Sequence, residues 1–261
     1  MDRKMMQKHK WQPTIIFLVL IAITYGSMVI TKFSLLQSLQ AFPEAIVWMF
    51  SNLLVSGEAL DKFPLVLKTL IDTVLMSIAA TTTGGAVALF LSLMGSRTTT
   101  THSIWLGLAR FVASVSRNVP IAAWALILLL SFGQNSVTGY LALFVGSVGF
   151  LTRAFIETID EASKQAVEAL QATGATYFQV VAKAVIPQCL PQLISWVLFM
   201  IETNIRSATL VGILTGTGIG YTFDIYYKSM NYEIVALATF SIVLAVILIE
   251  MASNYLRKVI L

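Results

Sequence analysis

Charge is scarce in this sequence. Only 11% of its 261 residues are charged, whereas 57% are hydrophobic and the mean hydropathy is +0.82. Charged residues make up roughly a quarter of an ordinary soluble domain, so the chain lies outside that class. Each membrane span needs about 20 apolar residues, so the length allows several spans but no large soluble domain besides. These figures predict an all-α, polytopic membrane protein with about six transmembrane helices.

Residues that usually carry chemistry are also rare. The single cysteine, Cys189, excludes an intrachain disulfide and a cysteine-rich metal site. His9 and His102 lie near the ends of apolar segments and are too few for a histidine metal site or a serine–histidine pair. No Gly-x-x-x-x-Gly-Lys-Ser/Thr phosphate loop occurs, so the chain should not hydrolyse ATP itself. We therefore expect no catalytic residues, no metal ligands and no cofactor.

The first apolar segment, Trp11 to Thr31, follows the basic stretch Met1–Lys10. This order also fits a cleaved signal peptide, but the run is long enough to span and no small-residue cleavage site follows it. We interpret residues 1–34 as a cytoplasmic N-terminus and a first transmembrane helix. The mixed composition of residues 35–67 then predicts an extracytoplasmic linker with short amphipathic helices.

Five further spans are predicted in residues 68–261. The turn residues Gly133 to Ser136 divide an uncharged stretch that is too long for one helix. A glycine-rich apolar stretch, residues 207–221, is expected after the fifth of the six spans. The five spans are expected at about residues 68–94, from residue 104 through Pro120, 137–156, 186–205 and 234–255.

Basic residues are distributed unevenly between the loops. Because cytoplasmic loops collect Lys and Arg, we expect both termini and the loop of residues 157–187 on the cytoplasmic side. The opposite side has three lysines, which are offset by five carboxylates. The net charge of +4 is accordingly attributed to membrane topology, and we expect no nucleic-acid partner. The basic residues assigned to the cytoplasm are Arg3, Lys4, Lys8, Lys10, Arg97, Lys164, Lys183, Arg257 and Lys258.

The loop of residues 157–187 has an amphipathic pattern. Apolar residues recur every three to four positions, and Gly174 permits a tight turn between two short helices. Pro187 suits the first turn of the following span. Such a segment lies along the membrane surface or inserts an apolar face into the groove of a partner. The recurring positions are Val167, Leu170, Gly174, Phe178 and Val181.

This loop resembles the EAA loop of ABC-importer permeases, with Glu-Ala-Ala, a glycine and a closing Ile-x-Leu-Pro. Glu168, Ala169, Gly174 and Pro187 match that pattern, while Leu170, Ala184 and Ile186 replace one apolar residue by another. The resemblance implies coupling helices that dock on a separate ATP-binding subunit. An ordinary interfacial helix is the alternative. The residues expected to couple to the ATPase are Glu168, Ala169, Leu170, Gly174, Phe178 and Pro187.

The resemblance extends over residues 68–261, which resemble the five-helix core of methionine-importer-like permeases. Arg117 to Pro120 is similar to an Arg-x-x-Pro motif of the second core helix. More narrowly, Glu202 to Gly212 resembles phosphonate-importer permeases, where Glu-x-Asn-x-Arg-Ser-Ala-Thr precedes glycines. Permeases for phosphite or other small oxyanions could share that motif.

Each charge inside a membrane needs a partner or a wet cavity. Arg110 and Arg117 share a helix face. They line an anion path, pair with Asp72, Glu157, Glu202 or Glu250, or extend towards the lipid headgroups. Arg206 either pairs with Glu202 on the same helix or meets an anion at the outer mouth. The glycines after it allow close packing or a gate. The candidate path or gate residues are Arg117, Asn118, Arg206, Ser207, Thr209, Gly216, Gly218 and Gly220.

The resemblance implies a permease subunit of an ATP-driven importer that works by alternating access as a homodimer in a bacterial inner membrane. Its partners would be the ATP-binding subunit, an extracytoplasmic substrate-binding protein, a second copy of the chain and the lipid bilayer. The expected substrate is phosphonate or a related phosphorus oxyanion. Alternatives are a permease for methionine or another small solute, a secondary transporter and a membrane enzyme. The last two would show inverted repeats or a cluster of His, Asp or Cys, and neither is evident.

Overall fold

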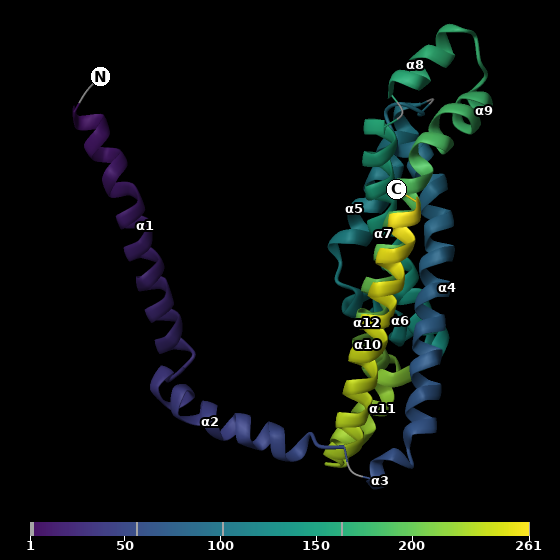
Figure 1. Cartoon of the computed structure of the whole chain (residues 1–261). Helices are drawn as coiled ribbons and strands as arrows, with labels where there is room; N and C mark the ends of the chain where they lie inside the picture. The colour runs from purple at the N-terminus through teal and green to yellow at the C-terminus, as the bar shows by residue number, and fades with distance from the viewer. Residues whose placement is uncertain (1–2, 56, 101, 163, 261) are drawn as a thin grey trace. The chain divides into compact units, whose positions relative to one another are not determined.

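The computed structural model describes residues 3–55, 57–100, 102–162 and 164–260 (Figure 1). Helices account for all the regular secondary structure of these residues, in agreement with the predicted all-α class. The chain divides into two compact units, Met1–Leu53 and Leu54–Leu261. Among the described residues, five helices are long and apolar enough to cross a membrane, or six spans result when the bent pair α5–α6 is taken as one span. The predicted number of spans is thus confirmed.

The first unit contains two helices. Helix α1 (Arg3–Ile30) includes the apolar segment Pro13–Ile30, whose hydropathy of 2.2 fits a membrane span. Helix α2 (Leu35–Asn52) begins after Ser34, whose side chain accepts a hydrogen bond from the backbone N–H of Gln37. Helix α2 falls within the predicted linker.

The second unit is a bundle around helix α7, which is covered by α4, α5, α6 and α10 (Figure 1). A side chain on Gly84 of α4 would place its Cβ 2.9 Å from the Cβ of Ser147 on α7, so this glycine permits the two helices to approach closely. The helices of this unit are α3 (Gly57–Leu60), α4 (Phe63–Gly95), α5 (Ser103–Asn118), α6 (Ile121–Phe132), α7 (Ser136–Ala162), α8 (Lys164–Ala172), α9 (Tyr177–Val180), the π-helical turn η1 (Val181–Val185), α10 (Ile186–Thr215), α11 (Gly218–Lys228) and α12 (Tyr232–Ile260).

The third predicted span is not one straight helix. Helices α5 and α6 meet at an angle of 94°. Val119 is extended, with φ −86° and ψ 123°, because a following proline disfavours helical backbone. The bend packs against Gly149 of α7, where a Cβ would lie 2.6 Å from the backbone nitrogen of Arg117. Pro120 is present in the sequence, but we predicted a single span that continued through this residue.

The fifth span also differs from its prediction. Helix α10 continues past Ile205 to Thr215, so residues 207–215 are helical rather than a separate apolar stretch. It ends at Gly216, which has φ +70° and ψ 34°, the left-handed conformation that favours glycine. Pro187 lies in the first turn as predicted, although helical backbone already begins at Tyr177 and continues through η1.

Candidate functional site

The loop after α7 folds as two short helices around a glycine turn. Gly174 has φ +78°, and the N–H of Ala175 donates back to the Leu170 carbonyl at 3.2 Å. Thr176 and Gln179 form a capping box, in which the Thr176 N–H donates to Gln179 Oε1 at 2.8 Å. The structure therefore confirms the predicted tight turn, with α8 and α9 on either side of it.

The loop is anchored on one face and open on the other. Val167 and Val180 are buried in an apolar cluster with residues of α4, α7 and α10. Glu168 is exposed, and Phe178 is 81% exposed. The exposed Phe178 ring packs only edge-to-face on Tyr177 among the ring contacts of the described residues, so most of its surface is open, as an apolar residue predicted to enter a partner's groove would be. The other expected coupling residues, Ala169, Gly174 and Pro187, are exposed, and Leu170 is half-buried.

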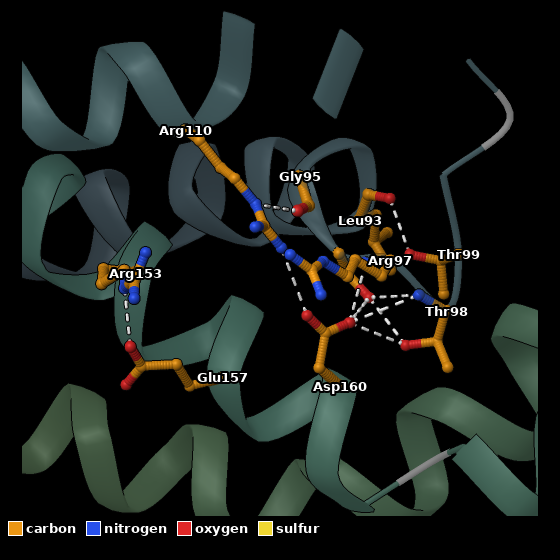
Figure 2. A network of polar contacts seen from close by, with 10 residues as sticks. Leu93, Gly95, Arg97, Thr98, Thr99, Arg110, Arg153, Glu157 and Asp160 are labelled. Atoms are coloured by element: carbon orange, nitrogen blue, oxygen red, sulfur yellow. Dashed lines mark hydrogen bonds and ion pairs between the residues drawn. The ribbon is translucent and has the colours of Figure 1, made fainter. Parts of the chain in front are cut away.

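Asp160, near the end of α7, holds the α4–α5 loop (Figure 2). Its Oδ1 accepts hydrogen bonds from Ser96 Oγ at 2.6 Å, Arg97 N at 2.8 Å and Thr98 Oγ1 at 2.9 Å. Its Oδ2 accepts from Arg110 at 3.4 Å, and Arg110 Nε also donates to the Gly95 carbonyl at 3.0 Å. One carboxylate near the end of α7 therefore joins the end of α4, the loop after it and the middle of α5.

A cavity of about 520 Å³ lies beside this carboxylate and extends to α8. Charges of both signs line it, including Arg97 and Arg153, and Arg153 Nε donates to Glu157 Oε1 at 2.6 Å. Glu168, the glutamate of the predicted coupling motif, lines the same cavity. The cavity thus lies between the loop predicted to couple to the ATPase and the residues near the ends of α4 and α7.

The two arginines of α5 have different surroundings. Arg110 forms an ion pair, as one alternative predicted, but with Asp160 rather than with any of the four carboxylates considered. The guanidinium of Arg117 lies 5.9 Å from the Phe150 ring centroid, and no carboxylate in the described part of the chain pairs with it. Asn118 is exposed and donates to the Ser114 carbonyl at 2.8 Å.

Glu202 of α10 joins two arginines. Arg206 NH1 donates to Glu202 Oε1 at 2.8 Å, which confirms the predicted pair within the helix. Arg257 NH2, from the last turn of α12, donates to Glu202 Oε2 at 3.3 Å and to Ser253 Oγ at 2.9 Å. The Glu202 side chain is 10% exposed and that of Arg206 is 46% exposed.

Arg206 lies inside α10, about 14 Å along the helix axis from its end at Thr215. Ser207 and Thr209 follow it and are half-buried. A path residue at this depth would meet an anion within the bundle.

Asn204 joins three helices at the centre of the bundle. Its Nδ2 donates to Thr81 Oγ1 of α4 at 2.8 Å and to Ser147 Oγ of α7 at 2.7 Å. The residue is fully buried, and its Oδ1 has no hydrogen-bond partner among the described residues. The amide acts as a polar clamp on the α4–α7–α10 core.

The candidate gate glycines form an elbow between α10 and α11. Gly218 has φ +62°, and a Cβ there would clash with Thr73 Oγ1, which instead accepts the Ile219 N–H at 2.9 Å. A Cβ on Gly220 would clash with the Thr209 carbonyl oxygen. Close packing, one of the two predicted roles, is therefore present at Gly220, whereas Gly216 terminates α10.

Two residues at these sites were not expected from the sequence. Asp160 lies in the polar segment after a span, and the serine and threonines of residues 96–100 were a signal for a carboxylate partner. Arg257 was assigned to the C-terminal tail. Its spacing of four from Ser253 placed both on one helix face, but only the three-dimensional fold brings Glu202 to that face.

Comparison with known proteins identifies relatives. Residues 93–260 match the family described as "Binding-protein-dependent transport system inner membrane component". The phosphite transport system permease protein PtxC of Stutzerimonas stutzeri is 34% identical over 192 residues, which cover 74% of this chain and 70% of that protein. The phosphate-import permease protein PhnE of Mycolicibacterium smegmatis is 27% identical over 187 residues, which cover 72% of this chain and 35% of that protein.

Solved structures share the fold. A chain of the MetNI methionine ABC transporter in an inward-facing conformation has a TM-score of 0.69 at 19% identity, covering 77% of this chain and 98% of that chain. A chain of an amino acid ABC transporter has a TM-score of 0.66 at 19% identity. The predicted permease fold is confirmed by these matches.

Proposed function

The chain belongs to the family of binding-protein-dependent transport system inner membrane components, and we propose that it carries a phosphorus oxyanion across the membrane. Membership makes it a multi-pass inner-membrane subunit of an ABC importer with no catalysis of its own. It also implies a binding protein and an ATPase as partners. The proposal concerns the substrate, the route and the coupling.

The proposed substrate class rests on the chemistry of Arg206 and on the similarity to named relatives. Arg206 is half-exposed inside α10, and its planar guanidinium suits the tetrahedral oxygens of phosphite, phosphonate or phosphate. Relatives named for phosphite and phosphate transport support an anion of this kind. The single observation that carries the proposal is Arg206, a half-exposed arginine at mid-helix whose carboxylate partner is shared with Arg257.

Coupling to the ATPase is proposed for the loop from Glu168 to Pro187. Its exposed Phe178 offers an apolar anchor for a groove, and buried Val167 and Val180 tie the loop to the spanning helices. Motion of a docked ATPase would reach α7 and α10 through these contacts. The proposed coupling residues are Glu168, Ala169, Leu170, Gly174, Phe178 and Pro187.

The route through the membrane is proposed to run past Arg117 and Arg206 towards the glycine elbow. Both arginines keep donor groups available. Among the described residues Arg117 contacts the Phe150 ring and pairs with no carboxylate, and the side chain of Arg206 is half-exposed. The elbow between α10 and α11 would serve as the gate. The full set of proposed path or gate residues is Arg117, Asn118, Arg206, Ser207, Thr209, Gly216, Gly218 and Gly220.

Two copies of the chain are proposed to enclose this route, with both termini in the bacterial cytoplasm. The basic residues assigned to the cytoplasmic side support that orientation through the positive-inside rule. The exposed side of Arg206 would face the space between the two copies. An oxyanion would then be surrounded by protein rather than lipid, as a charge in a membrane requires.

The substrate is tested by ATP hydrolysis of the complete complex in nanodiscs, with the binding protein added. Phosphite, methylphosphonate, phosphate and methionine are supplied separately. We expect at least one phosphorus oxyanion to stimulate hydrolysis, and methionine to have no effect. Stimulation by methionine alone would replace the substrate assignment and leave the permease assignment intact.

A further inference from the structure

Arg257 reaches from the last turn of α12 to a carboxylate in the middle of α10. It donates to Glu202 Oε2 at 3.3 Å and to Ser253 Oγ at 2.9 Å. The arginine side chain is 26% exposed, and its Nε–H is buried without an acceptor in the described part of the chain.

The geometry limits how Glu202 can hold Arg206. An arginine and a carboxylate commonly pair through two parallel hydrogen bonds, which use both carboxylate oxygens. Here Arg206 bonds Oε1 at 2.8 Å while Arg257 bonds Oε2. Arg206 is therefore held at one nitrogen, and the rest of its half-exposed guanidinium remains open to another acceptor.

The net charge of the cluster formed by Glu202, Arg206 and Arg257 also favours an anion near Arg206. Arg206 with Glu202 alone forms a neutral pair, which attracts an anion weakly. Arg257 adds one positive charge, so two arginines and one carboxylate leave a net charge of +1. In a partly buried site an unbalanced charge acts over several ångströms with little screening.

We propose that Arg257 is a positioning residue for the anion path, because it occupies one oxygen of Glu202 and so keeps Arg206 available to the transported oxyanion. This inference rests on the proposed function. Arg257 acts through Glu202 and is not required to touch the anion. It makes the end of α12 part of the transport machinery.

A purely structural role for Arg257 predicts different behaviour. In that case the Arg257–Glu202 contact would only attach α12 to α10, and its loss would lower the stability of the chain without changing the KM for the anion. In the proposed role, removing the Glu202 charge compensates for removing the Arg257 charge. A double variant separates the two roles.

The test is phosphite uptake by the complete complex in proteoliposomes, with KM and kcat measured for each permease variant. We expect Arg257→Gln to raise the KM about tenfold, because the cluster becomes neutral, while kcat changes little. Glu202→Gln with Arg257→Gln should return the KM to near the wild-type value. Lys258→Gln is the matched control, since it removes the same charge from an exposed neighbour, and it should leave KM unchanged.

Several results would overturn the inference. An unchanged KM in Arg257→Gln would contradict it. A double variant whose KM is raised as much as that of Arg257→Gln would also contradict it. If Arg257→Gln fails to assemble, Glu202→Gln alone decides, because the proposal requires its KM to fall below the wild-type value. The variant Arg206→Gln distinguishes failure of the proposed function from failure of this inference. Normal uptake in that variant would exclude a path past Arg206, and not only the role of Arg257.

Discussion

The Asp160 carboxylate accepts a hydrogen bond from the Ser96 hydroxyl at 2.6 Å, although 64 positions separate the two residues. This contact joins the end of the central helix α7 to the loop after α4. The same carboxylate also accepts from Arg97 N and Arg110. The carboxylate also lines the cavity that Glu168 of the proposed coupling loop lines, so it fixes the helix ends next to that loop.

Replacing Asp160 by asparagine should therefore destabilise this end of the bundle. The amide keeps the shape but loses the charge and places an N–H₂ group opposite donors. Hydrogen bonds to charged groups contribute about 1.5–3 kcal/mol each, so we expect a loss of about 2–4 kcal/mol. Thermal unfolding of the purified chain in detergent measures it. Glu161→Gln, an exposed neighbour, is the control, and an equal effect of the two changes would contradict the clamp.

Phe178→Ala should weaken attachment of the ATPase. The ring is 81% exposed, so its removal should cost the permease little stability. A buried aromatic anchor at an interface contributes about 2 kcal/mol or more, which corresponds to a loss of affinity of more than about tenfold. Binding of the purified ATPase to the permease in nanodiscs measures this loss.

The control for that experiment is Leu130→Ala on α6, which removes a side chain that is 89% exposed and lies outside the loop. It should bind the ATPase like the wild type. Wild-type affinity in Phe178→Ala would instead show that the loop docks without this anchor.

Gly220→Ala should disrupt the elbow between α10 and α11. A Cβ at this position would clash with the Thr209 carbonyl oxygen, which belongs to the α10 backbone and cannot yield as a side-chain tip can. We expect destabilisation of about 1–3 kcal/mol, the usual cost of overpacking, measured by thermal unfolding. Gly107→Ala on α5 is the matched control, because nothing lies within 4 Å of its added Cβ, and it should be neutral or slightly stabilising.

Asn204→Asp should be more harmful than Asn204→Ala. The hydroxyls of Thr81 and Ser147 donate to backbone carbonyls, so they face Asn204 as acceptors. A carboxylate would meet two acceptors and bury a charge, whereas alanine only loses two hydrogen bonds. Thermal unfolding of both variants measures which one is less stable. If the aspartate variant were more stable than the alanine variant, the two hydroxyls would have to turn and donate to the carboxylate, which would contradict this prediction.

The sequence predicted well those features that depend on local composition. Apolar length fixed the number of spans, and Gly174 marked the turn between α8 and α9 because a positive φ favours glycine. The Glu202–Arg206 pair followed from helical spacing alone. Each of these needs only neighbours in the chain.

Features that depend on packing between distant segments were missed. The 94° bend after α5 packs against Gly149 on α7, and helix α6 separates the bend from α7 in the sequence. The partners of Asp160 and Arg257 come from other helices, so no spacing rule could select them. The long α10 was cut short because its glycine-rich end was taken for an irregular segment, although Gly212 packs within the helix against the elbow.

The most direct test of the account is ATP-dependent uptake of radiolabelled phosphite by the complete complex in proteoliposomes. The account predicts uptake with the wild-type permease. Uptake should be abolished by Arg206→Gln although the ATPase still binds. Uptake should also be lost with Glu168→Ala, because ATP hydrolysis is then absent or no longer coupled to transport. Uptake that is unaffected by both substitutions would contradict the central claim that ATPase work enters at this loop and moves an oxyanion past Arg206.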